Sequence, residues 1–282
     1  MSDRYEMISI EQCVHYCGFL YGSQSKINPY QDYLYHFHRG ESKKEVRDRF
    51  IRFLLSYRPR NMAEALNINL TKEYPLWQYP WDHPSFSYPR RILSRLLYLT
   101  RNYMKPNQTL NNRVEKSPKK TDPPCAGWID DPLDIPDILT HFSSNGIYMF
   151  KIEQEFVQLE RAYYNIREKG YKPNLADNPI EAIKLISGIG ERKFIITDGN
   201  HRISSLYSLG KLEPIRCRIT NEVYEEDLQN WHQVKAGLFT RDDARKIFSL
   251  YFVGNELNYY SLPQTEQIML LGADFKGPTF RE

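Results

Sequence analysis

Hydrophobic and polar positions follow a helical period through much of the first hundred residues. Val46, Phe50 and Phe53 are three or four positions apart, which places them on one face of a helix. Four short motifs are typical of helix starts, because a polar side chain can cap the first turn and proline fits its first position. These motifs are Ser9 with Gln12, Asn28 with Pro29, Ser42 with Glu45, and Asn61 with Glu64. The first of them predicts a helix that carries Cys13 to Cys17.

The pattern changes after Gly146, where short apolar runs alternate with helical segments. Short apolar runs fit buried strands, and longer segments with a period near 3.6 fit helices. We expect strands over 147–152, 179–186, 192–197 and 214–219, helices over 155–169 and 201–209, and a mostly helical segment over 224–257. This alternation predicts an α/β fold with a mainly helical region before it.

The stretch 105–137 separates these two parts of the chain. It contains six prolines and has no regular hydrophobic period. Such a length without periodicity is typical of a linker or of a lid over a site. We therefore expect a mainly helical, Tyr- and Trp-rich N-terminal domain over 1–104, a Pro-rich linker or lid over 105–137, and an α/β domain with C-terminal helices over 138–282.

Composition and charge exclude some classes of protein. Hydrophobic residues make up 41% of the 282 residues, which is enough for a core and excludes wholesale disorder. The net charge of +3 is too small to indicate a nucleic-acid binder. The charge is uneven, because residues 90–120 hold nine Lys and Arg and one acid, a net +8 that leaves −5 elsewhere. We favour a solvated helix face and a basic linker here over a surface for nucleic acid or another acidic partner.

The sequence also bears on the cellular location. No apolar run approaches the roughly 18 residues that a spanning helix needs, and the first residues contain no apolar leader. The four cysteines lack the dense spacing of a disulfide framework. We therefore expect a reduced, cytoplasmic protein without a membrane span, in which Cys13 and Cys17 are core residues rather than a metal-binding pair. The 21 tyrosines, many of them before Gly146, suit a surface that lines a ligand.

One motif carries candidate chemistry, at the junction of a predicted strand and a predicted helix. The strand around Ile195 runs into Asp198-Gly199, and the next helix begins with His201 and Arg202 in its first turn. A helix N-terminus offers free N–H groups and a partial positive charge, so basic side chains are unfavourable there unless an anion binds. This arrangement therefore predicts a phosphate site.

Asp198 is the one acid in this predicted phosphate site. An acid beside phosphate normally holds Mg²⁺ or orients a hydroxyl group. The alternative is an ordinary Asp-Gly turn, in which Asp198 caps the helix and His201 and Arg202 are exposed. Spacing alone favours neither interpretation.

The motif Asp198-Gly199-Asn200-His201-Arg202, with the helix and strand that follow it, resembles the signature of the ParB/sulfiredoxin superfamily. The resemblance covers about residues 147–220, roughly a quarter of the chain. It is closest to the free serine kinases, whose motif is Asp-Gly-His-His-Arg, because only Asn200 differs. Sulfiredoxins have a catalytic cysteine at that position, so reduction of sulfinic acids is not expected. Chromosome-partitioning ParB proteins carry Gly-Glu-Arg-Arg and a following DNA-binding domain, which nothing after residue 220 resembles.

The resemblance implies a ParB/sulfiredoxin-like mixed α/β fold and a function. The implied activity is a nucleotide-dependent kinase that transfers a phosphoryl group to a hydroxyl of a small polar acceptor, such as an amino acid, a polyol or a sugar intermediate. The implied ligands are ATP or ADP, with CTP as a further option, and Mg²⁺. The second hypothesis is a ParB-like CTP- or ATP-binding switch, or a nuclease, that acts on nucleic acid through residues 90–120.

The resemblance also assigns roles to residues. Asp198 would serve the metal or the acceptor hydroxyl as a catalytic residue. The nucleotide phosphates would be bound by Gly199, Asn200, His201 and Arg202. The kinases place a catalytic Glu shortly before their first helix, and either Glu153 or Glu155 matches it here, with Glu155 slightly preferred.

Overall fold

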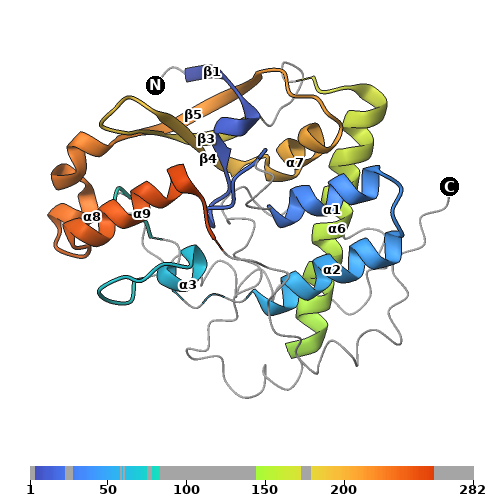
Figure 1. Cartoon of the computed structure of the whole chain (residues 1–282), viewed down its shortest axis with the longest axis horizontal. Helices are drawn as coiled ribbons and strands as arrows, with labels where there is room; N and C mark the ends of the chain where they lie inside the picture. Colours follow the sequence, from blue (N-terminus) through green and yellow to red (C-terminus); the bar gives the residue numbers. More distant parts are fainter. Residues whose placement is uncertain are drawn as a thin grey trace, which may run out of the picture.

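The chain folds around a mixed β-sheet with helices on both of its faces (Figure 1). The computed structural model describes residues 4–22, 28–57, 59, 61–74, 78–82, 144–172 and 179–256. The predicted linker over 105–137 and the basic stretch over 90–120 lie outside these residues. The prediction of an α/β fold is confirmed at this level.

Within the described residues, five strands form the sheet, in the order β1-β5-β3-β4-β2. They are β1 (Arg4–Ile8), β2 (Cys13–Val14), β3 (Ile180–Ile186), β4 (Arg192–Asp198) and β5 (Ile215–Tyr224). The pairs β3–β5 and β2–β4 are parallel, and the pairs β1–β5 and β3–β4 are antiparallel. The sheet thus combines two strands from the first 14 residues with three strands after residue 179, so the N-terminal part that was expected to be mainly helical also supplies strands.

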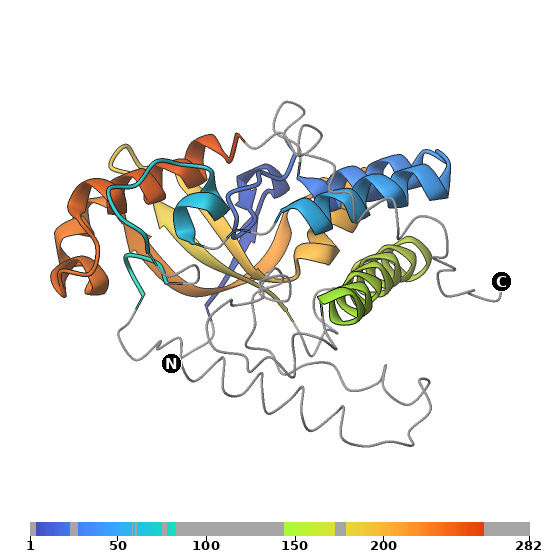
Figure 2. The same cartoon turned by 90° about the horizontal axis from the view of Figure 1, so that it is seen from below.

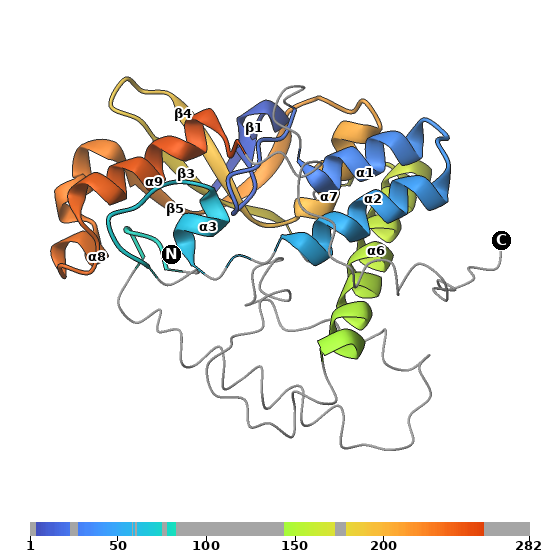
Figure 3. The same ribbon diagram turned by 60° about the horizontal axis from the view of Figure 1, so that its bottom comes forward.

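Helices gather in two groups at the two sides of the sheet (Figures 1 and 2). One group comprises α3 (Met62–Leu66), η4 (Glu225–Asn230), α8 (His232–Lys235) and α9 (Arg241–Val253). The other comprises α1 (Pro29–His38), α2 (Lys43–Ser56), α6 (Ser144–Lys169) and α7 (Asn200–Ser208), and a short 3-10 helix, η1 (Ile10–Gln12), lies between β1 and β2. In the second group, α7 packs against both α1 and α6 (Figure 3).

The core lies on both faces of the sheet. Phe194 and Ile196 of β4 pack beneath α7 with Ile203, whereas Ile195 between them packs on the opposite face with Phe248 of α9. A strand that is covered on both faces carries a continuous apolar run rather than an alternating one. This explains why the sequence around β4 could be recognised as a buried strand.

The strand predicted over 147–152 is wrong, because these residues belong to helix α6. A run of about six apolar residues fits a strand or one side of a buried helix equally well. No proline interrupts the sequence from Ser144 to Lys169, so the helix that was predicted to begin at residue 155 starts eleven residues earlier.

Two of the four predicted capping motifs form as expected, and the other two differ from the prediction. Asn28 caps α1 and Asn61 caps α3 through their side chains, as predicted. Ser42 is the N-cap of α2 but makes no side-chain capping bond. The Ser9 box is present, but it caps only η1, and strand β2 follows where a helix was predicted. The buried pairing of Cys13 and Val14 with β4 overrides this local helix signal.

Candidate functional site

The motif lies where strand β4 ends and helix α7 begins. Gly199 is the N-cap of α7 and has a φ of +102°, a conformation that is unfavourable for residues with a side chain. A Cβ atom at this position would also lie 2.7 Å from Cγ1 of Ile180 on the neighbouring strand. Because glycine has no side chain, the N-cap residue makes no side-chain hydrogen bond to the first N–H groups of α7.

Arg202 lies one turn into α7 and is held close to Asp198. Its Nη2 atom is 3.6 Å from Oδ1 of Asp198 and donates to the backbone oxygen of Pro179 at 3.3 Å. The side chain of Asp198 is 34% exposed and that of Arg202 is 20% exposed. The two charges therefore form a loose pair that solvent, or a ligand, can reach.

His201 forms a closer pair with an acid from a distant part of the chain. Its Nε2 atom is 2.9 Å from Oε2 of Glu155 in α6, and both side chains are mostly buried. The ring of Tyr30 in α1 lies 5.7 Å from the His201 ring. Of the two acids that the sequence left open, Glu155 thus contacts the motif, and the side chain of Glu153 lies outside the described part of α6.

Asn200 occupies a different position from its neighbours in the motif. Its side chain is only 2% exposed and accepts a hydrogen bond of 2.6 Å from the hydroxyl of Tyr21. Its Nδ2 atom donates to the backbone oxygen of Ile196 at 3.5 Å. The side chain therefore points into the protein. Tyr21 is 179 positions away in sequence, and no short-range signal could have identified it.

Several Tyr, Trp and Cys residues of the N-terminal region lie in the core, and others lie outside the described residues. Tyr79 and Trp81 stack on each other in the core beside Trp231, while Trp77 and His83 are not among the described residues. Cys13 and Cys17 are buried, as expected, and burial raises the pKa of Cys13 well above its usual value. Among the residues that the structure places, no group of three or more His, Cys, Asp or Glu could hold a metal ion.

An open groove of about 790 Å³ lies at the opposite end of β3 and β4. It is bordered by the turn between these strands, by η4 and by α9, and it carries both Arg241 and Arg245 and the acids Glu225 and Glu226. A seven-residue strand, about 20 Å long, separates it from the motif. We place the candidate site at the motif, where acidic and basic side chains meet at a helix N-terminus.

Comparison of the chain with family models, with curated proteins and with solved structures found no match. The resemblance to the ParB/sulfiredoxin superfamily therefore stays a hypothesis that rests on the motif residues. Within the described ranges, no helix is both long enough and apolar enough to cross a membrane.

Proposed function

We propose that the chain is a nucleotide-dependent kinase that phosphorylates a hydroxyl group of a small polar acceptor. The observation that carries this proposal is the convergence of Glu155 on the motif, where it contacts His201 at 2.9 Å from another helix. Glu155 comes from helix α6, 46 positions before His201, so the fold brings a second carboxylate to the motif. Asp198, Arg202 and the start of α7 complete a set of groups that suits phosphoryl transfer.

The phosphates of the nucleotide would lie at the N-terminus of α7. The N–H groups of the first turn and the guanidinium of Arg202 both favour negative charge there. The pair between Arg202 and Asp198 is loose enough, at 3.6 Å, for a phosphate oxygen to compete for the guanidinium. Arg202 would also stabilise the charge that spreads over the transferred group in the transition state.

In the reaction, the acceptor oxygen bonds to the terminal phosphorus of the nucleotide while the bond from that phosphorus to the bridging oxygen breaks. The nucleotide leaves with one phosphate fewer, and the proton of the acceptor hydroxyl passes to a carboxylate. Glu155 would be this base, since the bond to His201 uses only one of its two oxygens and fixes its orientation. Asp198 would orient the acceptor hydroxyl or help to hold Mg²⁺.

The residues present fit a Mg²⁺ ion that binds together with the nucleotide. Mg²⁺ is commonly bound through one or two carboxylates together with substrate phosphates, and it neutralises charge on those phosphates. Asp198 offers one partly exposed carboxylate, and the described residues hold no cluster of three metal ligands. This donor set matches binding that depends on the nucleotide.

The proposal is tested first by binding. The thermal unfolding midpoint would be measured with ATP, ADP, CTP and GTP, each with Mg²⁺, because a ligand that binds only the folded state raises the midpoint. A nucleotide that binds would then be incubated with a panel of amino acids, polyols and sugars, and phosphorylated products would be detected by ³¹P NMR. We expect one nucleotide to bind and at least one acceptor to be phosphorylated.

Variants locate the activity at the motif. We expect Asp198→Asn to lower phosphoryl transfer by about 100-fold or more, and Arg202→Ala to weaken nucleotide binding about tenfold. Asp242→Asn and Arg245→Ala are matched controls, since both residues are exposed on α9, and both variants should behave as the wild type. Full activity in both motif variants, absence of nucleotide binding, or metal-dependent cleavage of nucleic acid without a phosphorylated product would overturn the proposal.

A further inference from the structure

Two tyrosines from the N-terminal segment contact the chain on either side of Asp198 and Gly199. The hydroxyl of Tyr16 donates to the backbone oxygen of Thr197, the residue before Asp198, at 3.1 Å. The hydroxyl of Tyr21 donates to Oδ1 of Asn200, at the first position of α7, at 2.6 Å. The two hydrogen bonds thus bracket Asp198 and Gly199, which form the turn of the proposed phosphate site.

The bond from Tyr21 is deep inside the protein. Tyr21 is 1% exposed and Asn200 is 2% exposed, so water does not compete for this contact. Burial raises the pKa of Tyr21 well above its usual value, and the hydroxyl therefore keeps its proton and acts as the donor. A buried hydrogen bond of this kind restricts the rotamer of Asn200 and, through it, the backbone at the start of α7.

The segment that carries both tyrosines is itself held in place by hydrogen bonds from other parts of the protein. The backbone oxygen of Tyr16 accepts hydrogen bonds from the hydroxyls of Tyr79, at 3.2 Å, and Tyr251, at 2.8 Å. The backbone oxygen of Gly18 accepts from the N–H of Asn255 at 2.8 Å. The tyrosines therefore reach the motif from a support that is fixed to helix α9 and the segment after it.

We propose that Tyr16 and Tyr21 are positioning residues that hold the phosphate-binding turn in its binding conformation, an inference that rests on the proposed function for what the turn binds. Neither hydroxyl reaches the ligand. Both act by keeping residues 197–200 in place, so that the carboxylate of Asp198 and the N–H groups of α7 are organised before the nucleotide arrives. Such preorganisation improves affinity because less freedom is lost on binding.

The test compares three Tyr→Phe variants, each of which removes one hydroxyl. Tyr21→Phe and Tyr16→Phe affect the turn, and Tyr57→Phe is the matched control, because the buried hydroxyl of Tyr57 donates to the backbone oxygen of Ala65 at 2.6 Å instead. We expect the nucleotide dissociation constant to rise about tenfold in Tyr21→Phe, about threefold in Tyr16→Phe, and not at all in Tyr57→Phe. All three should lose similar amounts of thermal stability.

A double-mutant cycle shows whether Tyr21 acts through Asn200. If it does, the variant that combines Tyr21→Phe with Asn200→Ala binds the nucleotide no more weakly than Asn200→Ala alone. Additive losses, or equal affinities in Tyr21→Phe and Tyr57→Phe, would contradict the proposal.

Amide hydrogen exchange separates this inference from the proposed function. Without any ligand, Tyr21→Phe should speed exchange at the N–H groups of residues 199–203, whereas Tyr57→Phe should not. If Tyr21→Phe speeds exchange but the wild-type protein binds no nucleotide, the positioning role is supported and the proposed function is overturned. Unchanged exchange together with normal nucleotide binding would overturn the positioning role alone.

Discussion

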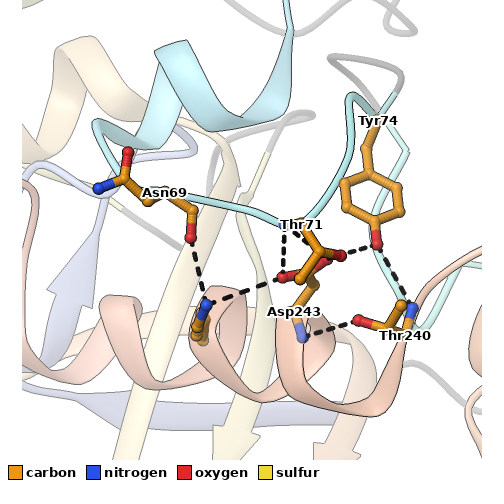
Figure 4. A network of polar contacts seen from close by, with 6 residues as sticks. Asn69, Thr71, Tyr74, Thr240 and Asp243 are labelled. Atoms are coloured by element: carbon orange, nitrogen blue, oxygen red, sulfur yellow. Dashed lines mark hydrogen bonds and ion pairs between the residues drawn. The ribbon is translucent and has the colours of Figure 1, made fainter.

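Asp198 and Asp243 both lie at the start of a helix, and their surroundings differ in almost every respect. Asp243 is fully buried in the first turn of α9 (Figure 4). It accepts hydrogen bonds from the backbone N–H and the hydroxyl of Thr71 and, at 2.6 Å, from the hydroxyl of Tyr74. Its own N–H donates to the hydroxyl of Thr240, so both carboxylate oxygens and the N–H of Asp243 have partners.

Asp198, in contrast to Asp243, is partly exposed to solvent. Its carboxylate is about one-third exposed, and within the described residues it pairs with Arg202 at 3.6 Å. A carboxylate whose oxygens are all engaged inside the protein can stabilise the fold but has no capacity left for a ligand. One that stays accessible beside a helix N-terminus keeps that capacity. The comparison teaches that the number of partners, rather than the residue type, separates a structural acid from a candidate catalytic acid.

The largest effect that we expect on stability comes from removing the buried acid. Asp243→Ala leaves the N–H of Thr71 and the hydroxyl of Tyr74 without their acceptor, at about 1–3 kcal/mol each, so unfolding free energy should fall by about 3 kcal/mol. Urea denaturation measures this loss. The exposed neighbour Asp242 provides the control Asp242→Ala, which should change stability by less than about 0.5 kcal/mol. A loss below about 1 kcal/mol for Asp243→Ala would mean that the two acids do not differ as described.

A loss of stability of intermediate size is expected from a substitution at Gly199, in the turn before α7. Gly199→Ala should cost about 2 kcal/mol, because the added methyl group meets Ile180 and the backbone has a positive φ. Gly210→Ala is the control, since Gly210 has a φ of +67° but no atom within 4 Å of the added methyl group. It should cost about 1 kcal/mol and leave nucleotide binding unchanged, whereas Gly199→Ala should weaken binding. Equal costs and equal affinities for the two variants would argue against a close approach at Gly199.

The smallest effect that we expect is a change in the pH dependence of stability. Burial alone would raise the pKa of Asp243, but hydrogen bonds from Thr71, Tyr74 and Thr240 outweigh it and hold the pKa below its usual value. Because the folded state binds the proton less readily than the unfolded state, this stabilisation is complete above the ordinary Asp pKa of about 3.9. It is lost as the pH falls through the lower pKa of the folded protein.

Unfolding free energies at pH 6 and pH 3 measure this dependence. Asp243→Asn cannot titrate at this position, so it should lose less stability between the two pH values than the wild type does. Other carboxylates titrate alike in both proteins, and the difference therefore isolates Asp243. Identical pH profiles would show that its pKa is the same in the folded and unfolded states.

Some features of the fold and of the site could be predicted from neighbouring residues. The caps at Asn28 and Asn61 were predicted correctly, because a cap and the N–H groups that it accepts from are two or three positions apart. Strand β4, the turn at Gly199 and helix α7 form one continuous segment with clear signals for each part. The motif could therefore be located by its local pattern alone.

Other features depend on contacts between distant residues. The run over 147–152 fits a strand by its length, and only the continuation of α6 shows that it is helical. The Ser9 box signals a helix, but pairing with β4 makes the next two residues a strand. The partners of the motif, Glu155 and Tyr21, are 46 and 179 positions away from the residues that they contact.

The sequence by itself thus determined the positions of the caps, the strand β4 and the strand–glycine–helix motif. The hydrogen bonds of the caps and the φ angle at Gly199 depend on residues a few positions apart, and the apolar run of β4 marks it as a buried strand. The tertiary structure alone decided which acid meets His201, that Asn200 points inward, and that two tyrosines hold the turn. Burial and long-range hydrogen bonds decide these features, and both depend on how the whole chain packs rather than on any short stretch of it.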